Sequence, residues 1–261
     1  MTKRQIVMSV GAVVLLVGIV SLIFGAISKG KAGQLASAPL VSTADAAAKG
    51  GEVASKDGIL AVRGRTVCDD PLYAPISGTP VLYYTYSVTA AWKETVPDKD
   101  HPGKNKTENK TKSVGGDSNA AEFSIDDGSG PVRIAVSGVG DLELTESPTQ
   151  TYTSRSSNES SITLGARVYK VSGFPEGTTF TARESVLNAT DSLFACGKIE
   201  NGTIGPSDMI LSTKSPEELI ASAQSSAKTG FTLGAIFSGL GVAGLLGGLI
   251  LVKNDDNLRK T

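Results

Sequence analysis

The stretch that decides the fold is Cys68–Trp92, CDDPLYAPISGTPVLYYTYSVTAAW. It joins a loop punctuated by proline and glycine, Pro71–Pro80, to a long strand in which apolar and polar residues alternate. An alternation with a period of two is typical of a half-buried strand. The apolar and aromatic face comprises Tyr84, Tyr86, Val88, Ala90 and Trp92. We therefore predict that this strand is the central strand of a mainly β domain.

Shorter strands are predicted on both sides of the central strand. They are Gly58–Asp69, Phe123–Ile125, Val132–Val136, Arg167–Val171, Thr178–Ala182, Leu193–Ile199 and Met209–Ser212. Asp126–Gly130, DDGSG, predicts a hairpin turn rather than a calcium site, because no complete ligand pattern follows it. The segment 94–120 contains almost no apolar residue, so we predict a mobile loop at the tip of a hairpin.

Two uncharged apolar runs flank this domain. Ile6–Ile27 and Thr229–Val252 are each long enough to span a bilayer as a helix. A cleaved signal peptide is the alternative for the first run, with Ala36–Ala38 as the cleavage site, but the run is longer than a typical signal core. A capping box at Ser215–Glu218 predicts a helix over residues 216–228, and we expect Gly230 to break or bend it.

The predicted organisation has five parts. Residues 6–27 form the first transmembrane helix, and residues 28–57 form a linker in which Ala44 and Ala46–Ala48 favour a short helix. Residues 58–227 form the β domain, residues 229–252 the second transmembrane helix, and residues 253–261 a tail. An opening strand, a long strand and an Asp-Gly hairpin also favour a small OB-like barrel.

Charges and acceptor patterns favour an extracytoplasmic domain with both termini in the cytoplasm of a two-pass cell-membrane protein. The terminal sides of the two runs carry Lys3, Arg4, Lys253, Arg259 and Lys260, and the domain sides carry Lys29, Lys31 and Lys228. This is a slight positive-inside bias. Glycosylation acceptor patterns begin at Asn105, Asn109, Asn158, Asn188 and Asn201.

Small residues recur along both apolar runs. Gly11, Gly18 and Gly25 are seven residues apart in the first run. The second run carries Ala235, Gly239, Ala243 and Gly247 at a spacing of four, and also Gly244 and Gly248. Small residues let membrane helices approach closely. We expect these series to pack helices together, either within one chain or between chains.

Composition excludes several function classes. A net charge of −1 gives no reason to expect nucleic-acid binding. Two cysteines and one histidine are too few for a zinc finger or RING. His101 lies in the polar segment beside Pro102, where a positioned catalytic base is not expected. Neither apolar run carries an ionisable residue, which argues against solute transport. We therefore expect no catalytic residues, metal or cofactor.

Cys68 and Cys196 fall in two predicted strands on the side expected to be oxidising. They could form a disulfide, which would stabilise the fold by closing a long loop. The alternative is two buried free thiols, because strand adjacency is not visible in the sequence.

Several short motifs, in this order and between two apolar runs, resemble the GIDE domain, also called the BAM (beside-a-membrane) domain. The matching positions are Pro71, Leu72, Pro75, Ser77, Gly78, Tyr84, Asp126, Asp127, Gly128 and Gly130. Later motifs are Pro175–Gly177, Leu193–Gly197 and Ile210–Leu219. The resemblance covers roughly residues 58–225, and the domain is best known from mitochondrial GIDE-type E3 ubiquitin ligases.

The resemblance implies a domain held beside a membrane. In the family's ligases a RING follows the second span, whereas Lys253–Thr261 contains neither Cys nor His. We therefore expect an interaction or scaffold module that contacts a protein partner or a second copy of the chain. The loop Pro71–Gly78 and the Tyr/Trp strand would be its surface, unless they form the core. The alternative function is that of an E3 ubiquitin-transferase-family protein by similarity, or another enzyme.

Overall fold

The computed structural model describes residues 3–99, 101–136, 141–190, 192–205 and 209–258. The chain folds as two units. Residues 1–38 and 214–261 form a helical unit, and residues 39–213 form a unit built mainly of strands. The fold is therefore mixed, with many β-strands between a long N-terminal helix and a long C-terminal helix.

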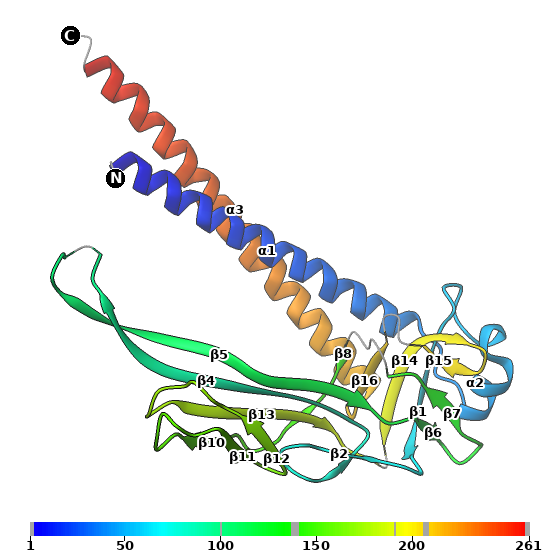
Figure 1. The fold of residues 1–261 in the computed structure, drawn as a ribbon. Coiled ribbons are helices and arrows are strands. Elements are labelled where there is room, and N and C mark those ends of the chain that lie inside the picture. Colours follow the sequence, from blue (N-terminus) through cyan, green and yellow to red (C-terminus); the bar gives the residue numbers. More distant parts are fainter. Residues whose placement is uncertain (1–2, 100, 137–140, 191, 206–208, 259–261) are drawn as a thin grey trace. The chain divides into compact units, whose positions relative to one another are not determined.

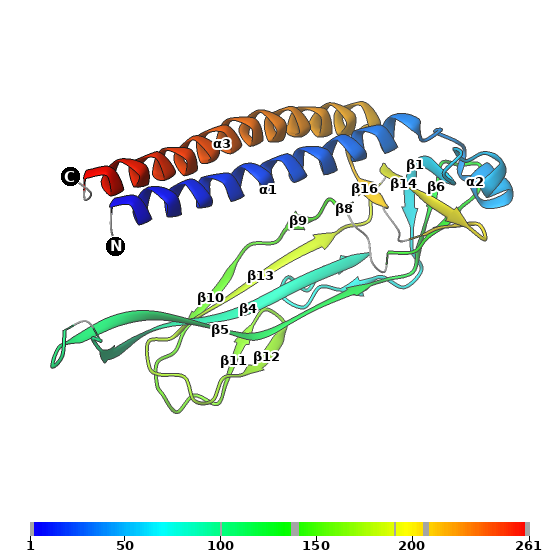
Figure 2. The ribbon, with the colours of Figure 1, turned by 90° about the horizontal axis from the view of Figure 1, so that it is seen from above.

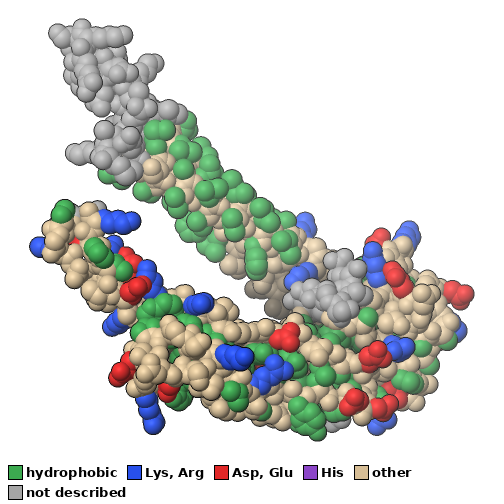
Figure 3. Space-filling view, in the orientation of Figure 1, with side chains coloured by type: hydrophobic (Ala, Val, Ile, Leu, Met, Phe, Trp, Pro, Cys, Tyr) green, Lys and Arg blue, Asp and Glu red, His purple; other side chains and the backbone are tan. Residues whose placement is uncertain are grey.

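The helical unit consists of α1 (Lys3–Ser37) and α3 (Pro216–Leu258), which lie side by side and antiparallel (Figures 1 and 2). Both are long and apolar enough to cross a membrane, over Ile6–Ser37 and Pro216–Gly247. Their outer surface is covered with hydrophobic side chains (Figure 3). In water this exposed apolar surface would be unfavourable, so it is consistent with a bilayer around the helices.

Glycines make the contact between the two helices. A Cβ at Gly18 would lie 2.5 Å from the backbone nitrogen of Ser238, and one at Gly11 would lie 3.0 Å from that of Leu245. The predicted series Gly11, Gly18 and Gly25 therefore packs within the chain. In the second run, the series at a spacing of four is not part of this contact, because a Cβ at Gly239 or Gly247 would meet nothing within 4 Å. Gly244 is part of it, because a Cβ there would lie 3.2 Å from the Cα atom of Gly11.

The prediction that Gly230 breaks the helix was wrong. Helix α3 continues through it from Pro216, and Gly230 is buried against Gly25 of α1. The predicted capping box is confirmed: the backbone nitrogen of Ser215 donates to Glu218 Oε2 over 2.9 Å, and that of Glu218 donates to Ser215 Oγ over 3.2 Å.

Residues 28–57 are more ordered than the predicted linker. Helix α1 continues to Ser37, and the expected short helix is present as α2 (Thr43–Lys49), followed by the 3₁₀ turn η1 (Gly50–Glu52). Ser42 caps α2 by accepting a hydrogen bond from the backbone nitrogen of Asp45. This side-chain cap satisfies one of the donors that every helix start leaves unpaired.

Five strands of the second unit form a closed ring of pairings. They are β1 (Ile59–Val67), β6 (Phe123–Asp126), β7 (Val132–Ile134), β15 (Thr203–Ile204) and β14 (Leu193–Glu200), in that order, and β14 pairs with β1 again. The β15–β7 pair is parallel, and the other ring pairs are antiparallel. Strands β16 (Ile210–Ser212) and β8 (Asp141–Leu142) extend the sheet beyond β14. Buried aliphatic side chains such as Leu60, Val62, Ile125 and Leu193 form one core here.

A second sheet is built around the predicted central strand, β4 (Tyr83–Pro97). Its order is β10 (Gln150–Thr153), β13 (Thr179–Leu187), β4 and β5 (Asn105–Ala120), and β9 (Thr145–Glu146) also pairs with β13. Two small hairpins complete the unit: β2 (Leu72–Tyr73) with β3 (Pro80–Val81), and β11 (Ser161–Leu164) with β12 (Arg167–Lys170). A second hydrophobic core contains Tyr84, Tyr86, Val88 and Phe180.

All the predicted strands are present, with differences of one or two residues at most ends. Strand β13 continues five residues past the predicted end at Ala182. The prediction of an irregular loop over residues 94–120 was wrong. That segment contains the end of β4 and all of β5, which pair from Tyr83↔Ala120 to Pro97↔Asn105. Polar residues on both faces can form a strand when neither face is buried, and such a strand has no alternating pattern to reveal it.

Candidate functional site

The loop Pro71–Gly78 and the aromatic face of β4 belong largely to the core, which was the alternative expected from the sequence. Tyr84 and Tyr86 are buried, as are Ala74 and Ile76 of the loop. The ring centroids of Tyr84 and Tyr86 lie 6.2 Å apart. Tyr73, Ser77 and Gly78 are exposed. The loop therefore offers only its outer edge to another molecule.

A buried carboxylate fixes this loop. Glu184 of β13 is 2% exposed. Its Oε1 accepts a hydrogen bond from the backbone nitrogen of Ile76 over 2.7 Å, and its Oε2 accepts from that of Ser77 over 3.0 Å. Ser147 Oγ donates to the same Oε2 over 3.1 Å. Three donors offset the cost of burying the carboxylate, so Glu184 serves to position the loop.

Glycine at position 165 allows the β11–β12 turn to reach the same loop. Gly165 has φ +62°, a conformation that glycine adopts without strain, and a Cβ there would overlap the carbonyl oxygen of Ile76. Its backbone nitrogen donates to Gln150 Oε1 over 2.7 Å. The motif loop is therefore held from β13 and from the β11–β12 turn.

Arg167, Tyr86 and Tyr169 form an aromatic cluster beside the loop. Arg167 Nη1 donates to the Tyr86 hydroxyl over 3.0 Å, and its guanidinium lies 5.4 Å from the centre of the Tyr86 ring. Burial, together with neighbouring Tyr86, raises the pKa of Tyr169 to about 12. Tyr169 therefore keeps its proton at neutral pH, and the cluster suits packing rather than acid–base chemistry.

The DDGSG motif is a structural turn, as predicted, and it also fixes the start of α2. Asp126 Oδ1 accepts from the backbone nitrogens of Gly128 and Gly130, over 2.8 and 3.2 Å. Asp127 accepts from the hydroxyl and backbone nitrogen of Thr43, over 2.7 and 3.2 Å. Hydrogen bonds from Ser129, and then from Thr43, hold the pKa of Asp127 well below its usual range.

The two cysteines are free thiols in this structure, so the predicted disulfide is not formed. Cys196 pairs in register with Ala61, whereas Cys68 follows the far end of β1. Ala61 and Cys68 are seven residues apart along an extended chain, which separates their Cα atoms by roughly 20 Å. A disulfide needs Cα atoms within about 7 Å, so Cys68 is too far from Cys196. Cys68 Sγ donates instead to the carbonyl oxygen of Glu122 over 3.5 Å. Burial raises the pKa of the Cys196 thiol to about 12.

The other polar positions singled out in the sequence lie apart on the surface. The five acceptor asparagines, Asn105, Asn109, Asn158, Asn188 and Asn201, are all exposed, as attachment of a sugar would require. His101 Nδ1 lies 2.9 Å from Asp98 Oδ2 near the tip of the β4–β5 hairpin. Among the residues that the structure describes, no group of three or more His, Cys, Asp or Glu side chains could hold a metal ion.

The outer part of the β4–β5 hairpin, residues 92–97 and 105–110, is the most distinctive exposed feature, and we call it the ribbon. Strand β13 begins at Thr179, opposite Ala91. Beyond Ala91, β4 therefore pairs only with β5 among the described strands, and the two extend past the sheet (Figure 1). Charged side chains of both signs lie along it (Figure 3).

Ion pairs support the ribbon where no third strand does. Lys110 Nζ lies 2.7 Å from Glu108 Oε2 and 3.9 Å from Glu94 Oε2 on the opposite strand. Lys106 Nζ lies 3.1 Å from Glu108 Oε1. The hydrogen bond from Lys110 lowers the pKa of Glu108. Such exposed pairs each contribute little, so the ribbon is held mainly by its backbone pairing.

A groove of 370 Å³ lies where the ribbon leaves the sheet. Trp92 and Lys93 of β4, Asn109 and Lys110 of β5, and Glu176 of the turn before β13 contribute to its lining. The rings of Trp92 and Phe174 pack edge to face, with centroids 5.5 Å apart. Lys112 Nζ lies 5.6 Å from the centre of the same Phe174 ring. The groove therefore combines an aromatic wall with charges of both signs.

The sequence pattern of β13 contains a signal that would have revealed Glu184. Phe180, Ala182, Glu184 and Val186 alternate onto the buried face of that strand. A carboxylate at a position that periodicity assigns to the core requires dedicated partners. The partners themselves, in residues 76–77 and 147, are too distant in sequence for any local pattern to indicate.

A protein-family model described as "GIDE: E3 Ubiquitin ligase" matches residues 93–247, which is more than half of the chain. The chain belongs to the GIDE family. The matched part of this GIDE protein begins with the ribbon and continues through β13 and β14 into α3. No curated protein and no solved structure matches the sequence.

The first motif quoted for the resemblance, residues 71–84, lies outside the matched residues. The DDGSG turn and the later motifs lie within them. The structure joins the two parts, because Glu184 from the matched part binds the backbone of Ile76 and Ser77. The loop is therefore fixed by a residue of the part that the family model matches.

Proposed function

We propose that this GIDE protein is a membrane-anchored interaction module that contacts a protein partner through the ribbon. The observation that carries the proposal is the isolation of the ribbon. Past Ala91 it pairs with no third strand among the described residues, and Trp92 at its root is the ribbon residue that packs against a core. A two-stranded hairpin alone is marginally stable in water. Contact with a protein partner would stabilise the extended hairpin and would explain why it projects beyond the sheet.

The groove at the root of the ribbon supports the same proposal. Aromatic side chains and charged residues at a rim are typical of the sites where protein partners bind most strongly. Trp92 supplies the aromatic anchor, and Lys93 and Glu176 supply charges of opposite sign. The partner surface would therefore combine an apolar contact with groups of both charges.

For the membrane, we propose that α1 and α3 both cross it and that residues 39–213 are extracytoplasmic. The slight excess of basic residues on the terminal sides of the apolar runs supports this orientation. The exposure of all five acceptor asparagines is compatible with it. The ring of β1, β6, β7, β15 and β14 is proposed to be an OB-like barrel, because an OB-fold is a small five-stranded barrel.

A role in ubiquitin transfer is the second candidate, favoured by the description of the family. In that case the GIDE domain would hold a partner or substrate for a transfer step. The two cysteines and one histidine of this sequence are fewer than a RING requires. A ubiquitin-transfer assay with purified activating and conjugating enzymes distinguishes the candidates: transfer that depends on this chain would favour the second.

The interaction proposal can be tested by site-specific photocrosslinking in native membranes, followed by mass spectrometry. A photoreactive residue at Thr95 or Thr107, both exposed on the ribbon, should capture a defined partner, whereas one at Val168, which is 69% exposed on β12, should not. Capture of a second copy of the chain would identify a homo-oligomer instead. If the ribbon positions and Val168 captured partners equally, or if neither captured any, the proposal that the ribbon is the contact surface would be overturned.

A further inference from the structure

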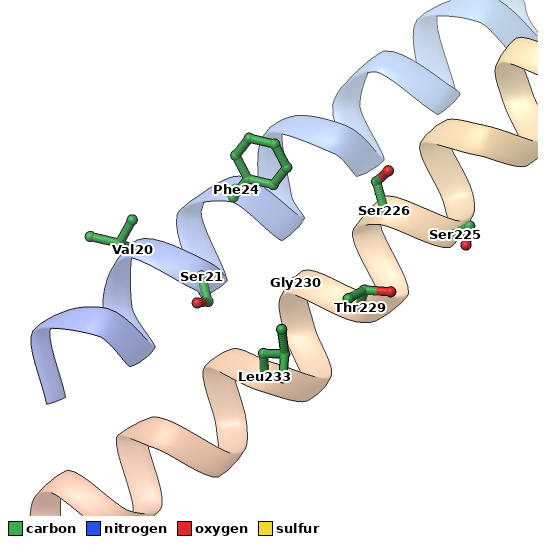
Figure 4. Close-up of a pocket in the computed structure, with 8 residues that line it drawn as sticks. All are labelled: Val20, Ser21, Phe24, Ser225, Ser226, Thr229, Gly230 and Leu233. Atoms are coloured by element: carbon green, nitrogen blue, oxygen red, sulfur yellow. The ribbon is translucent and has the colours of Figure 1, made fainter. Parts of the chain in front are cut away.

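A second groove, of 430 Å³, lies within the helical unit between α1 and α3 (Figure 4). It exists because the two backbones meet at Gly25 and Gly230, while the neighbouring positions carry side chains that do not fill the space between the helices. Its volume lies within the usual range for small-molecule sites, about 300–1,000 Å³.

The lining of this groove changes in character along its length. Val20 and Phe24 of α1 and Leu233 of α3 are apolar, and Ser225, Ser226 and Thr229 of α3 carry hydroxyl groups. Ser21 also lines the apolar end, and its hydroxyl donates to the carbonyl oxygen of Val17 over 2.9 Å within α1. The helices run antiparallel, with Gly18 against Ser238 and Gly25 against Phe231. Val20 and Leu233 therefore lie within the apolar runs, and Ser225 and Ser226 lie just before the domain-side end of the second run.

The charges at that end are all of one sign. Lys29 and Lys31 follow the apolar run of α1, and Lys228 precedes that of α3. No acidic residue occurs between positions 6 and 37 or between positions 219 and 247. The nearest carboxylate on one side, that of Glu218, accepts a hydrogen bond from the Ser215 backbone. An anion at the hydroxyl end of the groove would be favoured by these lysines.

We propose that this groove binds an anionic phospholipid. The headgroup phosphate accepts hydrogen bonds from the hydroxyls of Ser225, Ser226 and Thr229 and is attracted by Lys29 and Lys228. The part of one acyl chain nearest the headgroup lies along Val20, Phe24 and Leu233. Apart from Ser21, whose hydroxyl is bonded within α1, the order of hydroxyl and apolar groups along the groove is the order of headgroup and chain in a lipid. The proposal rests on the membrane placement above and not on the partner of the ribbon.

The test places the wild-type protein and its variants in nanodiscs of three quarters phosphatidylcholine and one quarter phosphatidylglycerol. Native mass spectrometry then counts the molecules of each lipid that stay bound to the protein. The wild type should retain phosphatidylglycerol in preference to phosphatidylcholine. K29Q/K228Q should weaken this preference by about fivefold for each lysine, which is about 1 kcal/mol each. Ser226→Leu, which fills the groove, should abolish it.

Ala235→Leu is the matched control, because Ala235 is exposed on the other side of α3 and Gly239, one turn on, has no neighbour within 4 Å. An unchanged preference in K29Q/K228Q would overturn the proposal. Equal effects of Ser226→Leu and Ala235→Leu would overturn it as well, since lipids would then bind the helices without a site. Carbonate extraction tests the placement separately: release of the protein would refute the membrane insertion itself.

Discussion

Gly230 of α3 lies directly against Gly25 of α1: a Cβ at position 230 would be 2.8 Å from the Cα atom of Gly25. The same Cβ would be 3.0 Å from the carbonyl oxygen of Ser21. These nearest atoms of α1 belong to its backbone, so a side chain at position 230 could not be accommodated by the movement of a flexible side chain. This contact sets the separation of the helices near the domain-side end of the apolar runs.

Gly230→Leu should therefore destabilise the helical unit. Forcing a large side chain into a packed site costs typically about 1–3 kcal/mol. Thermal unfolding of the full chain in detergent should show a lower midpoint. Gly239→Leu is the control and should leave the midpoint unchanged, because its position is open. If Gly239→Leu were the more damaging change, the contact between helices would lie between chains rather than within one.

Glu184→Ala should be among the most destabilising substitutions in the strand-built unit. It removes the acceptor for the backbone nitrogen of Ile76, which is buried, and for that of Ser77. A buried donor left without an acceptor costs about 1–3 kcal/mol. Chemical denaturation should show the loss, whereas Glu176→Ala, at an exposed position, should change the midpoint little. Equal effects of the two substitutions would contradict the role assigned to Glu184.

Asp127 should make the strand-built unit sensitive to acid. Hydrogen bonds from Ser129 and Thr43 lower its folded-state pKa from the ordinary value of 3.8. A lowered folded-state pKa contributes stability above the unfolded-state pKa, and that stability is lost as the pH falls below about 3.8. Asp127→Asn should therefore lower the melting temperature at pH 7, and the difference from wild type should narrow between pH 5 and pH 3. Asp70→Asn, at an exposed position, is the control and should change the melting temperature little at any pH. If the melting temperatures of Asp127→Asn and wild type differed by the same amount from pH 5 to pH 3, the proposed pH dependence would be contradicted.

The elements that the sequence predicted are those whose signals are local. The alternation of β4 shows which face is buried because residues two apart share a face. The capping box at Ser215–Glu218 is complete within four residues. The hydrogen bonds from Gly128 and Gly130 to Asp126 likewise lie within the Asp-Gly turn. In each case, the pattern that indicates the element lies within the element itself.

The features that the sequence did not predict depend on distant partners or on the absence of burial. Strand β5 has solvent on much of both faces, so its residues carry no alternating pattern. Glu184 and Ile76 are 108 positions apart. Gly230 was interpreted as a helix breaker because its contact with Gly25, on the other helix, is not visible locally. The family resemblance supplied the order of the motifs but not these contacts.

Thiol labelling should distinguish the two cysteines. Cys68 is partly exposed, and Cys196 is fully buried with a pKa raised to about 12 by desolvation. A maleimide reagent should therefore modify Cys68 in the folded protein and Cys196 only after unfolding, because the reagent needs access and a thiolate. The melting temperature should be the same with and without a reductant. Protection of both thiols until reduction would show a disulfide that this structure lacks.

Shortening the ribbon should separate its role in binding from the stability of the fold. Residues 95–107 are replaced by Asn-Gly, a favoured two-residue turn that joins the paired Glu94 and Glu108. The melting temperature should stay close to that of the wild type, because no part of either core is removed. Crosslinking of a partner near the root of the ribbon should be weakened, because only the groove residues such as Trp92 and Lys93 remain to bind it. A larger deletion, residues 98–116, should unfold the sheet, since it removes Gly115, over which the Tyr169 ring packs. If the short replacement unfolded the protein as well, the ribbon would be part of the stable fold and not a surface kept for a partner.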